Sequence, residues 1–205
     1  MQMRIKLLLI ALLFNGLPAM AQEEAELIAE NESYRAEQNA TFADPNESIL
    51  LAKDLKTFEG LDFYPIDLSF RVVASLIRTP DAKPFKMATS TQRLAEYVQY
   101  GELHFELKGV YQMLPIYQNT DHENQEGYED YLFLPFTDPT NGETTYGGGR
   151  YLEMWIPEGK TMVIDFNKAY NPYCAYNPGY SCPIPPRENN LTVAVEAGVK
   201  QFKKY

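Results

Sequence analysis

The sequence predicts a mainly β fold, in which an antiparallel sheet closes into a barrel or a sandwich. One or two N-terminal helices precede the sheet, and a long Pro/Tyr-rich loop interrupts it near the end. Apolar residues recur at helical spacing only before residue 60, and at every second position afterwards. Most connections are too short for the crossover helices that parallel strands need. About eight strands of this length are typical of a small barrel or sandwich.

The first 21 residues have the three parts of a signal peptide. Arg4 and Lys6 are followed by an apolar run at 7–14 and by Ala-Met-Ala at 19–21. The run is too short to span a bilayer. We therefore expect a signal peptide at 1–21, cut after Ala21, and a single domain at 22–205. Because Gln22, and not a cysteine that could carry a lipid anchor, directly follows the cut, and because no later stretch is apolar enough to be a membrane helix, the product is expected to be soluble and periplasmic or secreted.

The charge of the chain excludes some partners. Two of the 18 Lys and Arg residues lie in the predicted signal peptide, whereas all 28 Asp and Glu residues follow it, which leaves a formal charge of −12 (16 − 28). Such a surface repels phosphate backbones and anionic lipids. Nucleic acid is therefore not an expected partner.

Helical periodicity is confined to the region after the signal peptide. Apolar residues at that spacing predict one amphipathic helix up to Pro45, with Leu27, Tyr34 and Phe42 on its buried side. A second short helix is expected between Ser48, as its N-cap, and Gly60. Its apolar face would carry Leu51, Leu55 and Phe58.

Strand patterns fill most of the remaining chain. Lys108-Gly109 joins two of them as a tight turn, which predicts a hairpin. The last two strands before the long loop are expected to pair with each other across 157–160. The predicted strands are 70–77, 101–107, 110–118, 128–136, 150–156, 161–166 and 191–197.

A loop of 24 residues separates Phe166 from Leu191 and shows neither period. Loops this long inside a domain are usually functional or disordered. Its tyrosines provide apolar area to bury, and its prolines restrict the unfolded state, so we expect it to be ordered.

The only cysteines, Cys174 and Cys182, lie in this loop. In an oxidising compartment two lone thiols usually pair, so we predict a structural disulfide. A redox-active pair would normally be spaced Cys-x-x-Cys. A metal site would have to recruit His104 and His122, and their spacing fits no zinc pattern. No metal and no cofactor are predicted.

The segment "YGGGRYLEMWIPEGKTMVIDFNKAYNPYCAYNPGYSCPIPPRENNLTVAVEAGVK" at 146–200 resembles the signature of the bacterial family called domain of unknown function 1684. The upstream segments "DLKTFEGLDFYPID" and "RTPDAKPFKMATST" are also similar to its shorter members. The resemblance implies an exported or lipoprotein-like protein without an agreed activity. The two cysteines and the "PPREN" stretch belong to the family pattern, and no catalytic residue is established that could be transferred.

Three residues in the predicted strands 150–156 and 161–166 are candidates for chemistry. Arg150 follows three glycines, and its guanidinium could clamp a carboxylate or pair with Asp165 or Glu153. The two carboxylates together would suit acid–base work, as in glycoside cleavage. His104 and His122 have polar neighbours and are expected to be solvated, which argues against a Ser–His–Asp hydrolase.

Two functions follow from these patterns. The first is a ligand-binding or interaction module whose Tyr/Asn-rich loop meets a small molecule, a glycan, a peptide or a cell-envelope protein. The alternative is a hydrolase-like enzyme that uses Asp165, Glu153 and Arg150. The candidate binding residues are Arg150, Asn167, Tyr170, Asn171, Tyr173, Tyr176, Arg187, Glu188 and Asn189.

Overall fold

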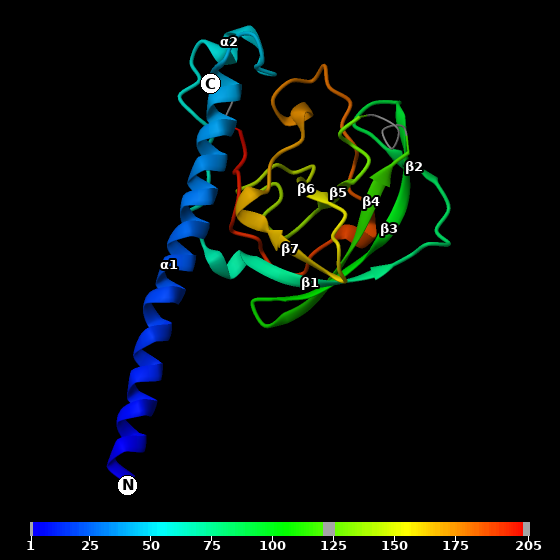
Figure 1. Cartoon of the computed structure of the whole chain (residues 1–205). Helices are drawn as coiled ribbons and strands as arrows, with labels where there is room; N and C mark the ends of the chain where they lie inside the picture. The colour runs from blue at the N-terminus through cyan, green and yellow to red at the C-terminus, as the bar shows by residue number, and fades with distance from the viewer. Residues whose placement is uncertain (1, 121–125, 203–205) are drawn as a thin grey trace.

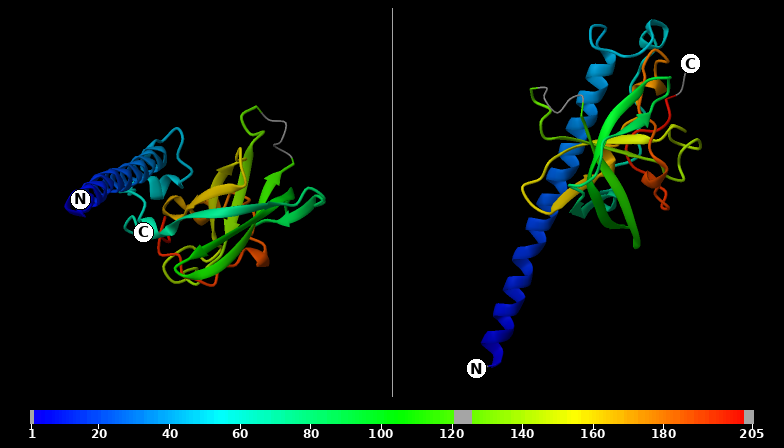
Figure 2. Two further views of the ribbon diagram at one scale, coloured as in Figure 1. Left: turned by 60° about the horizontal axis from the view of Figure 1, so that its bottom comes forward. Right: turned by 90° about the vertical axis from the view of Figure 1, so that its right-hand side faces the viewer.

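A computed structural model describes residues 2–120 and 126–202, with side chains from Met20 onward. Within this part, seven strands form one antiparallel sheet in the order β6-β5-β4-β3-β1-β7, and β2 pairs with β3 outside this path. The sheet is curled into a half-barrel (Figure 1), and Figure 2 shows its curvature from two further sides. The strands are β1 (Arg71–Arg78), β2 (Phe85–Ala88), β3 (Leu94–Leu107), β4 (Val110–Asn119), β5 (Tyr131–Phe136), β6 (Arg150–Trp155) and β7 (Thr161–Asp165).

The predicted hairpin is confirmed and is the longest element of the sheet. Lys108 and Gly109 both have positive φ, at 51° and 77°, as a two-residue type I′ turn requires. Strand β3 begins earlier than predicted and carries an irregularity between Gln99 and Gly101. A Cβ at Gly101 would lie 2.6 Å from the carbonyl oxygen of Ile77, so only glycine allows β1 to approach here.

The predicted pairing of 150–156 with 161–166 is wrong. Strand β6 pairs with β5, and β7 pairs with β1. The register places Val72 opposite Ile164 and Ala74 opposite Met162, so that β7 keeps its apolar residues on the core side. Strands β6 and β7 therefore end the hydrogen-bonded path on opposite sides. We call the open line between them the seam.

The strand predicted at 191–197 is also absent from the described structure. This segment runs irregularly across the end of the half-barrel and buries Leu191, Val195 and Ala197 in the main core. Two of its backbone donors bond to side chains: the N–H of Val195 donates to Asp138 Oδ1, and the N–H of Thr192 donates to Gln112 Oε1, whereas the N–H of Leu191 donates to the carbonyl of Thr137.

Arg150 holds this C-terminal segment and is completely buried. One guanidinium nitrogen donates to Asp138 Oδ2 at 3.0 Å and to the carbonyl of Val195 at 2.8 Å. The other donates to the carbonyl of Ala197. Burial lowers the pKa of Arg150, and Asp138 opposes this shift. The predicted clamp on a substrate, or pair with Asp165 or Glu153, is therefore replaced by an internal anchor.

Helix α1 (Gln2–Ala43) confirms the predicted amphipathic helix and continues through the predicted cleavage point. Its second half packs beside the sheet, whereas its first half extends away from it (Figure 1). The N–H₂ of Asn31 donates to Asp165 Oδ2, and the hydroxyl of Tyr34 donates to the carbonyl of Lys168. No helix in the described part of the chain is long and apolar enough to cross a membrane.

Helix α2 (Ala52–Leu55) is shorter than predicted. Its N-cap is Leu51 without a side-chain bond, and it ends before Lys56 instead of at Gly60. Ser48 is not the cap because its hydroxyl donates to the carbonyl of Phe42 and accepts from the N–H of Leu50. The long loop contains the 3₁₀ turns η2 (Phe166–Lys168), η3 (Tyr173–Ala175) and η4 (Arg187–Asn189), whereas η1 (Leu68–Phe70) precedes β1.

Replacing Arg150 tests the C-terminal anchor. Arg150→Ala leaves Asp138 buried without its cation, and we expect a loss of about 3–5 kcal/mol in the free energy of unfolding, measured by urea denaturation. Arg150→Lys keeps the charge but not the forked geometry, so its loss is expected to be smaller but clear. The exposed Arg187→Ala is the control, within about 0.5 kcal/mol of the parent. A loss below about 1 kcal/mol for Arg150→Ala would contradict the anchor.

Candidate functional site

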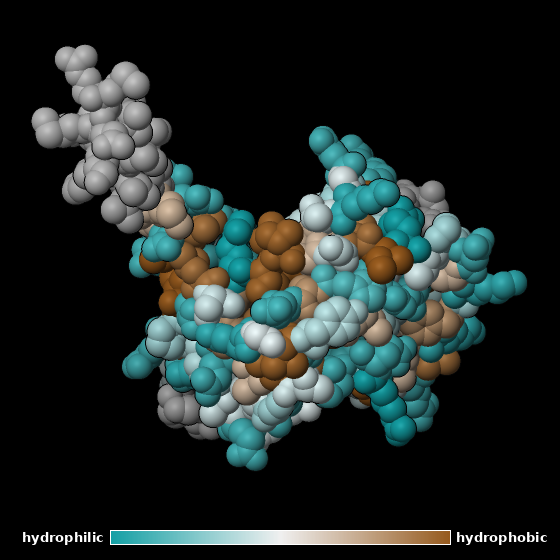
Figure 3. All heavy atoms as spheres, turned by 90° about the horizontal axis from the view of Figure 1, so that it is seen from below, coloured by the Kyte–Doolittle hydropathy of each residue, from teal (hydrophilic) through white to brown (hydrophobic). Residues whose placement is uncertain are grey.

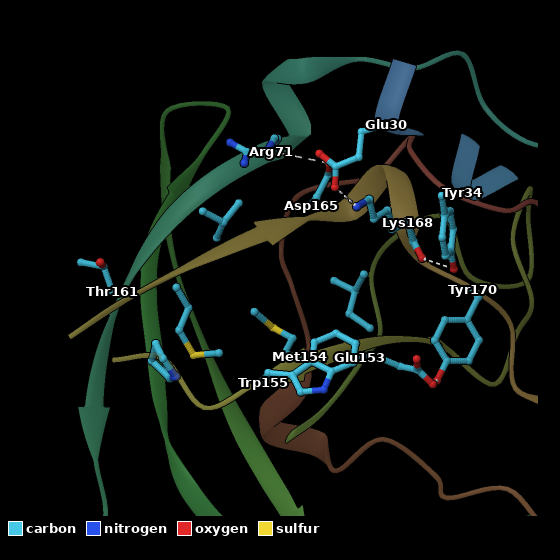
Figure 4. A pocket seen from close by; sticks show the side chains of 14 residues that line it. Glu30, Tyr34, Arg71, Glu153, Met154, Trp155, Thr161, Asp165, Lys168 and Tyr170 are labelled. Carbon is cyan, nitrogen blue, oxygen red and sulfur yellow. Dashed lines mark hydrogen bonds and ion pairs between the residues drawn. The ribbon is translucent and has the colours of Figure 1, made fainter. Parts of the chain in front are cut away.

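A cavity of about 480 Å³ lies in the seam, between the outer edges of β6 and β7 (Figure 4). We call it the seam pocket. Helix α1 and the start of β1 complete its walls. Its lining residues are Glu30, Tyr34, Arg71, Leu152, Glu153, Met154, Trp155, Pro157, Thr161, Met162, Val163, Asp165, Lys168 and Tyr170.

The alternation of the two strands decides which of the pocket side chains are buried and which are exposed. On β6, Leu152 and Met154 are buried in the core, whereas Glu153 and Trp155 are exposed on the other face. Trp155, the only tryptophan of the chain, is 57% exposed. Apolar side chains also gather on the molecular face beside α1 (Figure 3). Among the exposed ones on β7 and its neighbour β1 are Val163 and Val73.

Tyr170 comes from the long loop, and a backbone bridge to β6 positions it at the pocket. The N–H of Tyr151 donates to the carbonyl of Tyr170 at 2.9 Å, and the reverse bond is 3.1 Å. This bridge pairs the outer edge of β6 with the loop at Tyr151 only, and the rest of that edge faces the seam. The loop therefore delivers Tyr170 beside Glu153, whose Oε1 accepts from the Tyr170 hydroxyl at 3.3 Å.

Glu153 has an unusual environment for a carboxylate that solvent can reach. The pocket walls raise its pKa by desolvation, and the Tyr170 hydroxyl opposes this shift. Tyrosine hydroxyls surround it: burial raises the pKa of Tyr34 and of Tyr131, and the charge of Glu153 adds to both shifts. Figure 4 shows the Glu153 side chain between Trp155 and Tyr170.

Asp165 also lines the pocket, but both of its oxygens are engaged. Oδ1 accepts from the backbone N–H of Asn167 and from its side chain, and Oδ2 accepts from Asn31. Arg71 Nε lies 3.9 Å from Oδ2. Asp165 thus caps η2 and fixes α1 on the sheet. The structure brings it to the same cavity as Glu153 while leaving it no free oxygen for catalysis.

The remaining charges at the pocket are paired. Lys168 Nζ lies 2.5 Å from Glu30 Oε1, which joins the long loop to α1. Neither residue was predicted as part of a site, nor were Arg71, Tyr34 and Trp155. Trp155 had a usable signal, because it stands in the outward phase of its predicted strand together with Glu153. Residues from α1 had none, since their position depends on tertiary packing.

Besides Arg150, four predicted binding residues lie inside the protein instead of at the pocket. Asn167 exchanges hydrogen bonds with the backbone of Asp67 in both directions. Asn189 donates to the carbonyls of Pro115 and Pro135 and accepts from Tyr117, which locks the loop onto the sheet. The other two, Asn171 and Tyr176, are 1% exposed and bond to each other.

Three predicted binding residues, Tyr173, Arg187 and Glu188, are exposed but do not line the seam pocket. Tyr173 is 46% exposed and contacts Tyr180 edge to face, with ring centroids 5.3 Å apart. Arg187 and Glu188 are exposed within η4. Of the loop residues predicted to bind a ligand, Tyr170 is the one that the structure brings into the pocket.

The predicted disulfide is not formed in this structure, where Cys174 and Cys182 are free thiols. The N–H of Cys174 donates to Cys182 Sγ at 3.1 Å, and the Tyr146 hydroxyl lies 3.8 Å from Cys174 Sγ. Each sulfur therefore has its own hydrogen-bond partner, the backbone of Cys174 for Cys182 and Tyr146 for Cys174. The Cys182 thiol lowers the pKa of Cys174, with a smaller contribution from Tyr146.

His104 lies on the outer face of β3, as predicted. Its Nδ1 bonds to the Tyr111 hydroxyl, and its Nε2 lies 3.3 Å from Glu102 Oε2. His122 lies outside the described residues. Among the residues that are described, no three His, Cys, Asp or Glu side chains form a group that could hold a metal ion.

Glu153→Gln is expected to raise the melting temperature near neutral pH by about 1–3 °C. Because its pKa is raised in the folded state, the carboxyl group's contribution to stability is complete below the ordinary Glu pKa of about 4.3. It is lost as the pH rises through the folded-state pKa. The gain from the substitution should therefore grow between about pH 4 and pH 8. Exposed Glu158→Gln is the control; equal pH profiles for both variants would refute the desolvation of Glu153.

Comparison with known proteins places the fold in a family. Residues 56–200 match the family described as Protein of unknown function (DUF1684). The solution NMR structure of an uncharacterized protein from the haloarchaeon Haloarcula marismortui is similar, with 30% sequence identity and a TM-score of 0.67. The match covers 87% of this chain and 96% of that one. No curated protein matches. The expected restriction to bacteria is not confirmed, but the resemblance in sequence is: this chain belongs to the DUF1684 family.

Proposed function

We propose that this chain is an exported ligand-binding protein whose binding site is the seam pocket. The observation that carries the proposal is the pocket itself. A cavity of about 480 Å³ combines an apolar floor with a carboxylate, a tyrosine hydroxyl and an accessible indole. Small-molecule sites are typically cavities of about 300–1,000 Å³ with few polar groups and apolar walls. A cavity of this size favours a small molecule or a short glycan over a large protein surface.

Binding is favoured over the alternative of hydrolysis by the state of the predicted catalytic residues. Asp165 is fully engaged by Asn31 and Asn167, and Arg150 is buried in the C-terminal anchor. Only Glu153 keeps acceptor capacity and access to the cavity. A pair of carboxylates that can both act on a glycosidic bond is therefore not assembled.

Export is proposed on the N-terminal sequence, with its basic, apolar and small-residue parts. The arrangement of α1 is compatible with cleavage after Ala21. The first half of the helix extends away from the sheet (Figure 1), and the bonds to the domain come from Asn31 and Tyr34. Cleavage would leave these contacts in place, so the mature domain would retain the wall of its pocket.

The fluorescence of Trp155 tests the binding site directly, because it is the only tryptophan and lines the pocket. We expect ligands from a library of glycans, peptides, small acids and amines to shift its emission to shorter wavelength. Val163→Phe narrows the pocket and should weaken each such ligand at least tenfold. The matched control is Val73→Phe, because Val73 is the exposed cross-strand partner of Val163 and does not line the pocket.

Two results would contradict the proposed site. One is a library in which no compound changes Trp155 emission or protein amide shifts at millimolar concentration. The other is a ligand that binds Val163→Phe and Val73→Phe equally well, which would place its site elsewhere on the protein.

The disulfide between Cys174 and Cys182 belongs to the same proposal, because it requires an oxidising compartment. A disulfide oxidant would take two electrons and two protons from the two thiols and be reduced to thiols itself. The nearness of Sγ of Cys182 to the backbone of Cys174 supports closure with little movement. The resulting ring has nine residues, from 174 to 182.

Thiol titration of the exported protein checks the disulfide. We expect no free thiol after export and two after reduction. Loop-closure entropy predicts that Cys174→Ser with Cys182→Ser destabilises the oxidised protein by about 2–3 kcal/mol. The same double variant, compared with the reduced protein, should show a much smaller difference. Two free thiols in native exported material would refute the disulfide.

A further inference from the structure

The charges that line the seam pocket do not cancel. Three acidic side chains, Glu30, Glu153 and Asp165, face two basic ones, Arg71 and Lys168. Lys168 pairs with Glu30 at 2.5 Å, and Arg71 lies 3.9 Å from Asp165. Glu153 has no basic side chain within ion-pair distance among the described residues. The pocket therefore carries one uncompensated carboxylate.

An uncompensated carboxylate inside a pocket is unfavourable for the free protein. Desolvation raises the pKa of Glu153, and the Tyr170 hydroxyl is the neutral group that offsets part of this effect. The chain as a whole carries an excess of acidic residues, so its long-range electrostatic field does not compensate the charge of Glu153 either. A positively charged ligand would provide the missing counter-charge.

The neighbours of Glu153 suit an organic cation better than a hydrated metal ion. Trp155 stands two residues away on the same face of β6 and is 57% exposed, and Tyr170 bonds to the carboxylate from the other side. The faces of tryptophan and tyrosine rings attract ammonium groups, most strongly when water is partly excluded. Leu152, Met154 and Met162 add apolar surface for the carbon part of the ligand.

We propose that the seam pocket binds an organic cation, with its amine or quaternary ammonium head held against Glu153 between Trp155 and Tyr170. This inference rests on the proposed function, since it names the ligand class of the same pocket. A neutral glycan could accept the same aromatic contacts but would leave the charge of Glu153 uncompensated. The two ligand classes therefore differ in how binding depends on charge.

Choline and 3,3-dimethylbutan-1-ol provide the test. They have the same shape, but choline has a charged quaternary nitrogen where the alcohol has a neutral quaternary carbon. Both are titrated against the protein at low salt, with Trp155 emission and amide chemical shifts as readouts. We expect choline to bind at least tenfold more tightly, with an advantage that shrinks as salt screens the interaction. Its affinity should rise with pH as Glu153 loses its proton.

Glu153→Gln is expected to weaken choline at least tenfold and to remove the pH dependence, with the neutral alcohol unchanged. Glu158→Gln, outside the pocket, should match the parent protein. Equal affinity for the two probes, or no choline binding at all, would overturn the cation. If another compound still binds and Val163→Phe weakens its binding, the proposed binding site is retained and only the proposal of a cationic ligand is rejected. If no compound binds, both the binding site and the cationic ligand are rejected.

Discussion

The buried ion pair between Arg150 and Asp138 is the interaction on which the rest of the structure depends. The C-terminal segment crosses the end of the half-barrel without a strand partner, so its carbonyls and N–H groups need side-chain partners. Arg150 supplies donors to Val195 and Ala197, and Asp138 accepts from Val195. The pair closes the core and fixes the first residue of β6. Its cost in desolvation is offset by the charge of Asp138 and by the hydrogen bonds to the carbonyls of Val195 and Ala197.

The position of β6 in turn produces the seam. One edge of β6 is paired with β5, and the other is bridged only at Tyr151 by Tyr170. Beyond that bridge no strand covers the edge in the described structure, and helix α1 forms one wall of the opening with Glu30 and Tyr34. Asp165 stabilises this arrangement by binding Asn31 of the helix and Asn167 of the loop. The candidate site is thus a consequence of a sheet that does not close, with a helix and a loop as its remaining walls.

The Tyr/Asn-rich composition of the long loop is compatible with two roles, ligand contact and internal packing. Tyrosine and asparagine suit ligand contact because they combine apolar area with hydrogen-bonding groups. The same properties suit the interior of an irregular segment, whose backbone groups lack a ladder and need partners. Asn189 bonds to the carbonyls of Pro115 and Pro135, and Tyr176 packs against Phe42. Most of the loop therefore stabilises the fold, and Lys168 and Tyr170 are the loop residues that reach the pocket.

By itself the sequence determined the amphipathic helix, the hairpin at Lys108-Gly109 and most strands, because these depend on local periodicity and turn conformation. It also placed Glu153 and Asp165 among the candidates. Only the tertiary structure decided that β6 and β7 stay apart and that 191–197 is not a strand, since pairing depends on which distant edge buries the most apolar surface. It likewise separated Arg150, buried in the core, from Glu153 at the cavity. Strand phase shows which face a side chain takes, but not which distant element covers that face.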